Sequence, residues 1–566
     1  MSSAKEPVMR RFGNGLTVLI KEDKSHPVVS LQYWVGTGSM NEGHWQGSGL
    51  SHLLEHLVFK GTAHFSGQEL ARKVQERGGH WNAYTSVNRT VYYIDGPAES
   101  WQIFLNLLTE LVFFPTFPED EMEREKEVVR REMAMYADDP DSVAYQLLMQ
   151  TLYLKHPCRW PVLGERAAFD CLTRQDVLDY HASRYVPNNV VLSIAGDVDA
   201  AEILSHLELL VEDLKSRPLN REPIPHEPHQ FGSRRVRKEF AVPYSKLHLA
   251  WRLPCSAHPD TPALSALSSI LGGGRSARFY EKFHDRLGLV YSIEVHSNQS
   301  ETDEGAFTIS MDVDRAQRDK VRDLVLQELR NLAEEDFTED LKRVCKQTRV
   351  SRLRRRSSAS GVASEMGADW FGSRNLNLSS EWQEAIERVT TEDLHRVCST
   401  WLSSPNVTEV SLDPPGSNAG DEERASASAG TALSEHVLGN GMKVVIREDH
   451  RLPLAYACMA FKAGCRAENE HDAGVTDLMS ECLLKGTSTR SAADIARFLE
   501  DIGGAINTST GNNSLSVGCQ VLAEDLDAGL ELMADVVMNP SFPEDAFLRE
   551  KESFVADAGE DMEDPL

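Results

Sequence analysis

Two similar stretches decide how this chain is organised. The first is Gly13-Asn14-Gly15-Leu16-Thr17-Val18-Leu19-Ile20-Lys21-Glu22-Asp23, and the second is Gly439-Asn440-Gly441-Met442-Lys443-Val444-Val445-Ile446-Arg447-Glu448-Asp449. Each places a Gly-Asn-Gly turn before an apolar run, which predicts a turn followed by a strand. The likeness indicates that one structural unit occurs twice in the chain.

Two later motifs repeat at a constant spacing. Lys60-Gly61-Thr62 returns as Lys485-Gly486-Thr487, and Pro115-Thr116-Phe117-Pro118-Glu119-Asp120 returns as Pro540-Ser541-Phe542-Pro543-Glu544-Asp545. Both pairs are offset by the same number of residues, 485 − 60 = 540 − 115 = 425. One offset held over about 55 residues indicates a duplication.

Composition divides the chain further. Residues 413–432 are rich in Pro, Gly, Ser and Ala and lack large apolar side chains, which predicts a flexible linker. A second, proline-rich boundary lies near residue 217. We therefore expect a first lobe over 1–217, a second lobe over 218–412, the linker, and an incomplete repeat of the first lobe over 433–566.

Periodicity in the first lobe alternates between strand and helix. Strands are predicted over residues 17–20, 28–35, 81–85, 91–94 and 190–194, and helices over 48–59, 68–77, 99–113, 119–136 and 175–185. The second lobe alternates in the same way. This pattern predicts an α+β fold of tandem homologous lobes, each a mixed sheet packed with helices.

Charge and cysteine usage exclude several functions. The chain has 59 basic and 87 acidic residues, a net charge of −28, which disfavours nucleic-acid binding. No apolar run approaches the roughly 18 residues that a membrane span needs, and residues 1–11 contain no apolar h-region, so a secretory signal is not expected. Nine scattered cysteines without a Cys-x-x-Cys pair fit reduced thiols, so a cytoplasmic location is expected.

The pattern that carries chemistry is His52-Leu53-Leu54-Glu55-His56. On a helix both histidines lie on one face, one turn apart, and Glu55 lies about 60° to the other side of His52. Two imidazoles at this spacing suit a zinc ion, and the carboxylate can act as a general base. The alternative is a pair of structural histidines that hydrogen-bond their neighbours.

A catalytic zinc ion held by two histidines needs a third ligand, commonly Glu, and an open position for water. On the predicted helix 119–136, Glu125 and Glu132 are seven residues apart and face the same way, within about 20°. Other acidic residues of this helix point elsewhere and are expected to be solvated. Spacing alone leaves both Glu125 and Glu132 open as ligands.

The block Gly49–Thr62 resembles the zinc site of the pitrilysin/insulinase family, which includes mitochondrial processing peptidase. That family has a Glu ligand about 75 residues after its second histidine, and residues 57–131 separate His56 from Glu132 here. The resemblance implies one zinc ion per chain and Glu125 as a supporting residue of the outer shell. It implies that His52, His56 and Glu132 are the three zinc ligands and that Glu55 is the catalytic base.

The resemblance also extends to substrate-binding regions. Residues 78–85 resemble the edge strand on which family substrates add as a further strand, with Asn82 and Ala83 at the matching positions. An ordinary strand entered through a Gly-Gly turn is the alternative. Family enzymes also use an Arg and a Tyr seven residues apart, whereas Tyr291 here is preceded at that spacing by His284.

The second copy lacks the chemical residues of the first. The counterparts of His52, Glu55, His56 and Glu132 are Asp477, Ser480, Glu481 and Asp557. Residue 566 corresponds to residue 141, so this copy is expected to be incomplete. The resemblance implies that a degenerate half of this kind closes over the substrate of an active half.

These patterns predict a zinc-dependent endopeptidase that hydrolyses peptides or unfolded polypeptide segments. The alternative is a zinc- and peptide-binding subunit that hydrolyses weakly or not at all. Such a subunit would need a second subunit or the missing C-terminal lobes to complete its chamber. Neither nucleic acid nor a membrane is expected as a partner.

Overall fold

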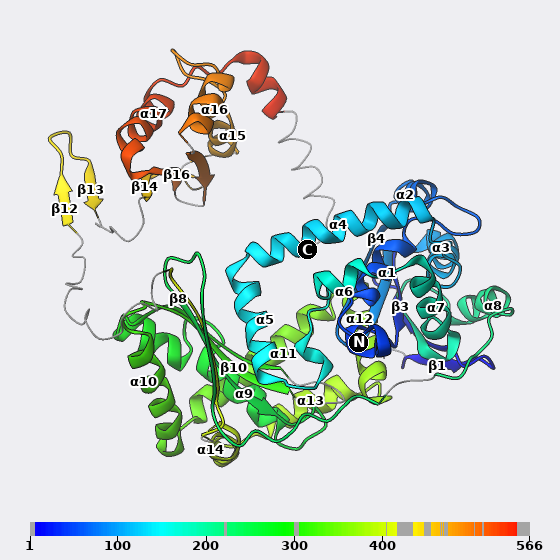
Figure 1. The fold of residues 1–566 in the computed structure, drawn as a ribbon. Coiled ribbons are helices and arrows are strands. Elements are labelled where there is room, and N and C mark those ends of the chain that lie inside the picture. The colour runs from blue at the N-terminus through cyan, green and yellow to red at the C-terminus, as the bar shows by residue number, and fades with distance from the viewer. Residues whose placement is uncertain are drawn as a thin grey trace. The chain divides into compact units, whose positions relative to one another are not determined.

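The computed structural model describes eleven segments of the chain, which are residues 6–219, 223–298, 305–402, 405–415, 434–446, 454–464, 466, 468, 474–502, 504–511 and 514–551. The chain forms two compact units, Met1–Ala425 and Ser426–Leu566. Each unit is described by itself, and the elements are labelled in Figure 1.

The first unit begins with a six-stranded mixed sheet in the order β1-β2-β6-β3-β5-β4. Its strands are β1 Val8–Arg11, β2 Thr17–Glu22, β3 Val28–Val35, β4 His80–Thr85, β5 Thr90–Pro97 and β6 Val190–Gly196. Strand β6 pairs in parallel with β2 and antiparallel with β3. This order leaves β4 as an edge strand of the described sheet.

Helices cover both faces of this sheet. The helices of this part of the chain are α1 Leu50–Val58, α2 Gly67–Gln75, α3 Trp101–Phe113, α4 Glu119–Asp138, α5 Pro140–Leu152, α6 Arg166–Asp170, α7 Arg174–Arg184 and α8 Ala200–Leu210. Helices α1 and α3 bury Leu53, Leu57 and Phe104 in a core with strand residues Leu31 and Ile94. The strands and helices predicted from periodicity are all present, with ends shifted by a few residues.

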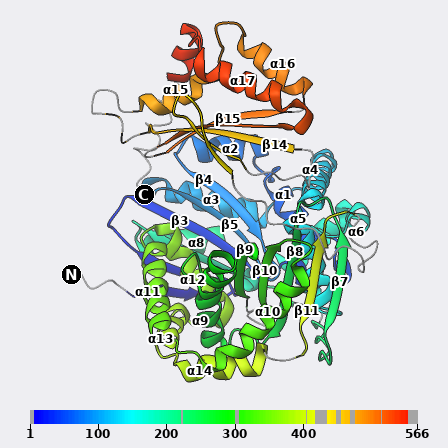
Figure 2. The same cartoon turned by 90° about the vertical axis from the view of Figure 1, so that its left-hand side faces the viewer.

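A five-stranded mixed sheet follows in the order β7-β11-β8-β10-β9 (Figure 2). Its strands are β7 Arg234–Glu239, β8 Ser245–Leu253, β9 Val290–Asn298, β10 Gly305–Val313 and β11 Thr408–Asp413. The accompanying helices are α9 Thr261–Gly272, α10 Arg318–Asn331, α11 Thr338–Arg355, α12 Ala359–Ser373, α13 Leu378–Glu387 and α14 Thr391–Val397. The predicted α+β class is therefore confirmed.

One helix from the second half covers the outer face of the first sheet. On α12, Gly367 lies so close to Trp34 of β3 that an added Cβ would come within 2.4 Å of the indole ring. Gln32 of β3 donates to the Ser364 hydroxyl of the same helix at 3.1 Å. The predicted boundary at residues 217–218 lies between α8 and β7, and it stays a prediction.

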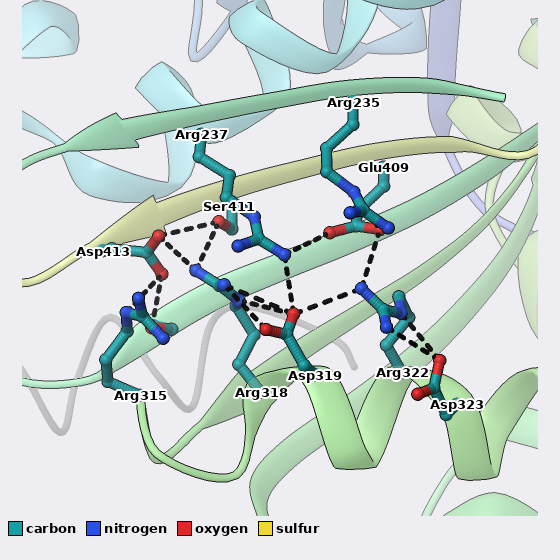
Figure 3. Close-up of polar contacts among 11 residues, drawn as sticks. Arg235, Arg237, Arg315, Arg318, Asp319, Arg322, Asp323, Glu409, Ser411 and Asp413 are labelled. Atoms are coloured by element: carbon teal, nitrogen blue, oxygen red, sulfur yellow. Dashed lines mark hydrogen bonds and ion pairs between the residues drawn. The ribbon is translucent and has the colours of Figure 1, made fainter. Parts of the chain in front are cut away.

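An ion-pair network fixes α10 against β7 and β11 (Figure 3). Arg318 of α10 and Asp413 of β11 pair with both side chains fully buried. Asp413 also accepts from the Ser245 hydroxyl at 2.6 Å, and Glu409, 3% exposed, accepts from Arg235 at 2.9 Å. If one partner of such a buried ion pair is removed, the other charge stays buried without compensation, and the fold is destabilised.

The network corrects one expectation. Asp413 was predicted to be the first residue of the linker, but it is the last residue of β11 and is completely buried. Its local sequence is typical of a linker, whereas its pairing with Arg318 places it in the interior. Most of the predicted linker, from residue 416 on, lies outside the described residues.

The second unit repeats the start of the first. Its described residues form two sheets, β12-β13 and β14-β16-β15, together with several helices. Its elements are β12 Ser434–Val437, β13 Lys443–Ile446, β14 Leu454–Phe461, α15 Val475–Leu483, α16 Ala492–Asp501, β15 Ala505–Thr510, β16 Leu515–Leu522 and α17 Leu526–Met538. Among the described residues, every helix is too short or too polar to cross a bilayer.

Candidate metal centre

Helix α1 presents the chemical residues of the first unit. Its apolar side chains Leu53, Leu54 and Leu57 are completely buried, which fixes the rotation of the helix. His52 and His56 therefore lie side by side on the partly exposed face, with ring centroids 4.7 Å apart. This is the arrangement that the four-residue spacing predicts.

Helix α4 brings a carboxylate to this pair. Glu132 Oε2 lies 3.8 Å from His52 Nε2 and 3.9 Å from His56 Nε2. One ligand atom from each of the three residues lies within 4.8 Å of the others, and no other group of this kind occurs in the described part of the chain. The structure thus brings together two segments that are far apart in the sequence.

The donor set fits a zinc ion. Four ligands at about 2.0–2.1 Å in a tetrahedron are about 3.3–3.4 Å apart, so the distances from Glu132 to the two histidines need to shorten by about 0.5 Å to hold the ion. Burial first, and the positive charge of His56 second, together lower the pKa of His52 to about 3. This imidazole is therefore neutral at pH 7, as a metal ligand must be.

Glu125 supports His56 from the opposite side. Glu125 Oε2 accepts from His56 Nδ1 at 3.0 Å, and Glu125 Oε1 lies 2.5 Å from Lys60 Nζ. Burial alone would raise the pKa of Glu125, but the hydrogen bonds from His56 and Lys60 lower it overall. A proton held on Nδ1 leaves the Nε2 lone pair of His56 pointing toward Glu132.

Glu55 lies beside the cluster and contacts the edge strand. Its carboxylate accepts a short hydrogen bond from the Thr85 hydroxyl, at the end of β4. Burial raises the pKa of Glu55, while the bond from Thr85 and the charge of His56 oppose that shift. A carboxylate with a raised pKa in such a place is typical of a general base.

Strand β4 carries the predicted substrate residues on the edge of the sheet. The exposed Asn82 accepts from the Ala83 N–H at 2.8 Å through its own side chain. An extended peptide can pair with such an edge through backbone hydrogen bonds. Of the two residues compared with the family's Arg and Tyr, His284 stacks on Tyr280 and Tyr291 lies against Tyr244.

Two contacts of the site were missed by sequence analysis. Thr85 bonds Glu55, and Lys60 pairs with Glu125. The sequence held a signal for Lys60, because the repeated Lys-Gly-Thr motif has Lys485 at the same place in the second copy. Lys485 pairs with Glu550 at 2.6 Å. Glu550 is the counterpart of Glu125 at the same offset.

The second copy keeps this framework without the imidazoles. On α15, Asp477 and Glu481 stand where the histidines stand in α1, and Ser480 replaces the base. The Thr510 hydroxyl, counterpart of Thr85, donates to Asp477. Asp557, the counterpart of Glu132, lies outside the described residues.

Two sequence models of peptidase family M16 match the chain. A sequence model described as insulinase (peptidase family M16) matches residues 17–166 and 443–564, and one described as peptidase M16 inactive domain matches residues 172–347. An uncharacterized zinc protease of Mycobacterium tuberculosis (strain ATCC 25618 / H37Rv) is 30% identical over 299 residues, which are 52% of this chain and 67% of that protein. An uncharacterized zinc protease of Rickettsia felis is 27% identical and covers 70% of this chain and 94% of its own length.

A solved structure shares the fold. The crystal structure of a protease from Helicobacter pylori has a TM-score of 0.67 and 26% sequence identity. The likeness covers 72% of this chain and all of that one.

Proposed function

The chain belongs to the insulinase family, peptidase family M16, and from this premise we propose that it is a zinc-dependent endopeptidase. The observation that carries the proposal is the convergence of both Nε2 atoms on Glu132 Oε2, at 3.8 and 3.9 Å, with Glu55 beside them. Relatives named zinc proteases support this metal.

The proposed ligands are His52, His56 and Glu132, and Glu125 holds His56 in position. A zinc ion bound there supplies a Lewis acid that polarises the scissile carbonyl and acidifies a water molecule. Glu125 keeps the proton of His56 on Nδ1, so that Nε2 remains free to act as a ligand.

Glu55 is the proposed general base. Its carboxylate takes a proton from the attacking water and then delivers that proton to the leaving amine. Thr85 orients this carboxylate through its hydroxyl. Because Thr85 ends strand β4, the base is held in register with the strand that receives the substrate.

The proposed substrates are peptides or unfolded polypeptide segments. Only an extended backbone can pair with the edge of β4, where Asn82 and Ala83 lie. On binding, the substrate backbone would replace the Asn82 side chain as partner of the Ala83 N–H. An unfolded segment offers its backbone N–H and C=O groups for this pairing.

A second candidate is a zinc- and peptide-binding subunit that hydrolyses weakly. It is favoured by His284, which stands where the family pattern has an Arg seven residues before the Tyr, and by the lack of imidazoles on α15. The two candidates differ in one measurement on the purified chain. Zinc and peptide binding without cleavage supports the second candidate, whereas cleavage that a chelator abolishes and zinc restores supports the first.

Metal binding tests the ligand set. The chain is expected to bind one zinc ion, and His52→Ala is expected to weaken binding by more than the 10–100-fold typical of a lost supporting residue. Competition with a chromophoric chelator measures the Kd. His26→Ala, which changes an exposed histidine, is the control and should bind as the wild type does. Unchanged affinity in His52→Ala would exclude this site.

Glu125→Gln tests the support of His56. The substitution removes a charge that pairs with Lys60 and His56, so zinc affinity is expected to fall about 10–100-fold. The matched control is Glu550→Gln, because Glu550 pairs with Lys485 in the copy without imidazoles. Equal zinc affinity in Glu125→Gln and the wild type would show that Glu125 does not support the site.

A further inference from the structure

The helix that carries both histidines cannot cap its own N-terminus. The residue before α1 is Gly49, with φ at +72°, and a Cβ there would lie 2.0 Å from the carbonyl oxygen of Leu163. Only glycine fits, and glycine has no side chain to accept the free N–H groups of the first turn. The cap must therefore come from elsewhere in the chain.

Glu42 supplies this cap from the preceding loop. Its Oε1 accepts from the Ser51 N–H at 2.9 Å, and the residue is completely buried. The Ser51 hydroxyl lies 2.7 Å from the hydroxyl of Tyr180, which lies 2.6 Å from the Thr37 hydroxyl. The Ser51 N–H and hydroxyl thus tie the start of α1 to the loop and to helix α7.

The second copy has the same cap. Helix α15 also begins after a glycine with positive φ, Gly474 at +85°. Glu468 accepts from the Thr476 N–H at 2.8 Å and from the Gly474 N–H at 2.7 Å. The cap is therefore present on both helices, whereas the imidazoles are present on only one of them.

We propose that Glu42 is a positioning residue for the metal centre, an inference that rests on the proposed zinc site. Ser51, whose N–H Glu42 holds, directly precedes His52 in the first turn of α1. His56 is fixed independently through Glu125. Loss of the cap frays the first turn and moves His52 relative to His56 and Glu132, so the three ligand atoms no longer converge.

A Gln side chain at position 42 should be able to cap α1 as Glu42 does. Burial raises the pKa of Glu42 to about 8, and the N–H groups and hydroxyl around it, those of Ser51 above all, oppose that shift. An oxygen remains available to accept from Ser51 whether or not the group is ionised. Gln keeps such an oxygen and Ala does not, so Gln should rescue the function that Ala removes.

The test compares zinc affinity in three variants of the full chain. Glu42→Ala is expected to raise the Kd for zinc about 10-fold or more, and Glu42→Gln to retain most of the affinity. Glu468→Ala removes the same cap from the second copy and should leave the Kd unchanged. The proposal is overturned if Glu42→Ala binds zinc like the wild type, or if Glu468→Ala weakens binding equally.

A second measurement separates the cap from the metal. Hydrogen exchange of the metal-free chain should be faster in residues 50–54 of Glu42→Ala and unchanged in α3. If the wild type binds no zinc at His52 and His56, the proposed function fails, while exchange still reports whether Glu42 holds the first turn. If Glu42→Ala does not fold, Glu42→Asp, whose carboxylate is one methylene shorter, takes its place under the same criteria.

Discussion

Replacing Glu55 with Gln is expected to lower kcat for peptide hydrolysis by about 10²–10⁴-fold, with bound zinc unchanged. The amide has the size of the carboxylate and keeps an oxygen that can accept from Thr85. It cannot take a proton from water, so the step that depends on the base is lost. Cleavage of an internally quenched peptide measures the rate, and metal analysis measures the zinc content.

The control for this prediction is Glu123→Gln. Glu123 is an exposed residue of α4, so the same chemical change there should leave kcat unaltered. A Glu55→Gln chain that still cleaves within tenfold of the wild type, with its zinc in place, would rule out Glu55 as the base. Loss of zinc in Glu55→Gln would instead assign Glu55 to the support of the metal.

The local part of this site could be predicted from the sequence. The spacing of His52, Glu55 and His56 fixes their directions once the segment is helical, because every residue of a helix turns by the same angle. The alternation of apolar residues then decides which face is buried. All three side chains accordingly lie where the spacing placed them.

The choice between Glu125 and Glu132 depended on tertiary structure. Both lie on one face of α4, so the spacing could not separate them. In the structure Glu132 faces both Nε2 atoms, while Glu125 contacts His56 at Nδ1. That difference arises from the position at which α4 crosses α1. The helical periodicity of either segment does not predict this position.

The features that the sequence did not predict depend on contacts between residues far apart in the chain. Strand β6 was recognised by its apolar residues, yet its place between β2 and β3 depends on contacts that span most of the sequence of the first lobe. The cap by Glu42 depends on the approach of Leu163 to Gly49, from a distant loop. Residues linked in this way leave no periodic signal in the sequence.

Asp413 shows the same limit in the second half of the unit. Its neighbours Pro414, Pro415 and Gly416 are typical of a linker, and this local signal led to the wrong start of the linker. The carboxylate of Asp413 pairs with Arg318, 95 residues earlier in the chain. Because a buried charge needs its partner, the pair with Arg318 keeps Asp413 in the interior as the last residue of β11.

Asp413→Ala is expected to lower the free energy of unfolding by about 3–5 kcal/mol, because it leaves Arg318 buried without its buried partner. Urea denaturation measures the loss, and hydrogen exchange in β11 locates it. The control is Glu76→Ala, which breaks an exposed pair with Arg72 and should cost about 0.5 kcal/mol or less. The double variant Arg318→Met, Asp413→Leu should be more stable than Asp413→Ala, since it leaves no unpaired buried charge. A loss in Asp413→Ala no larger than that in Glu76→Ala would contradict the role of the pair.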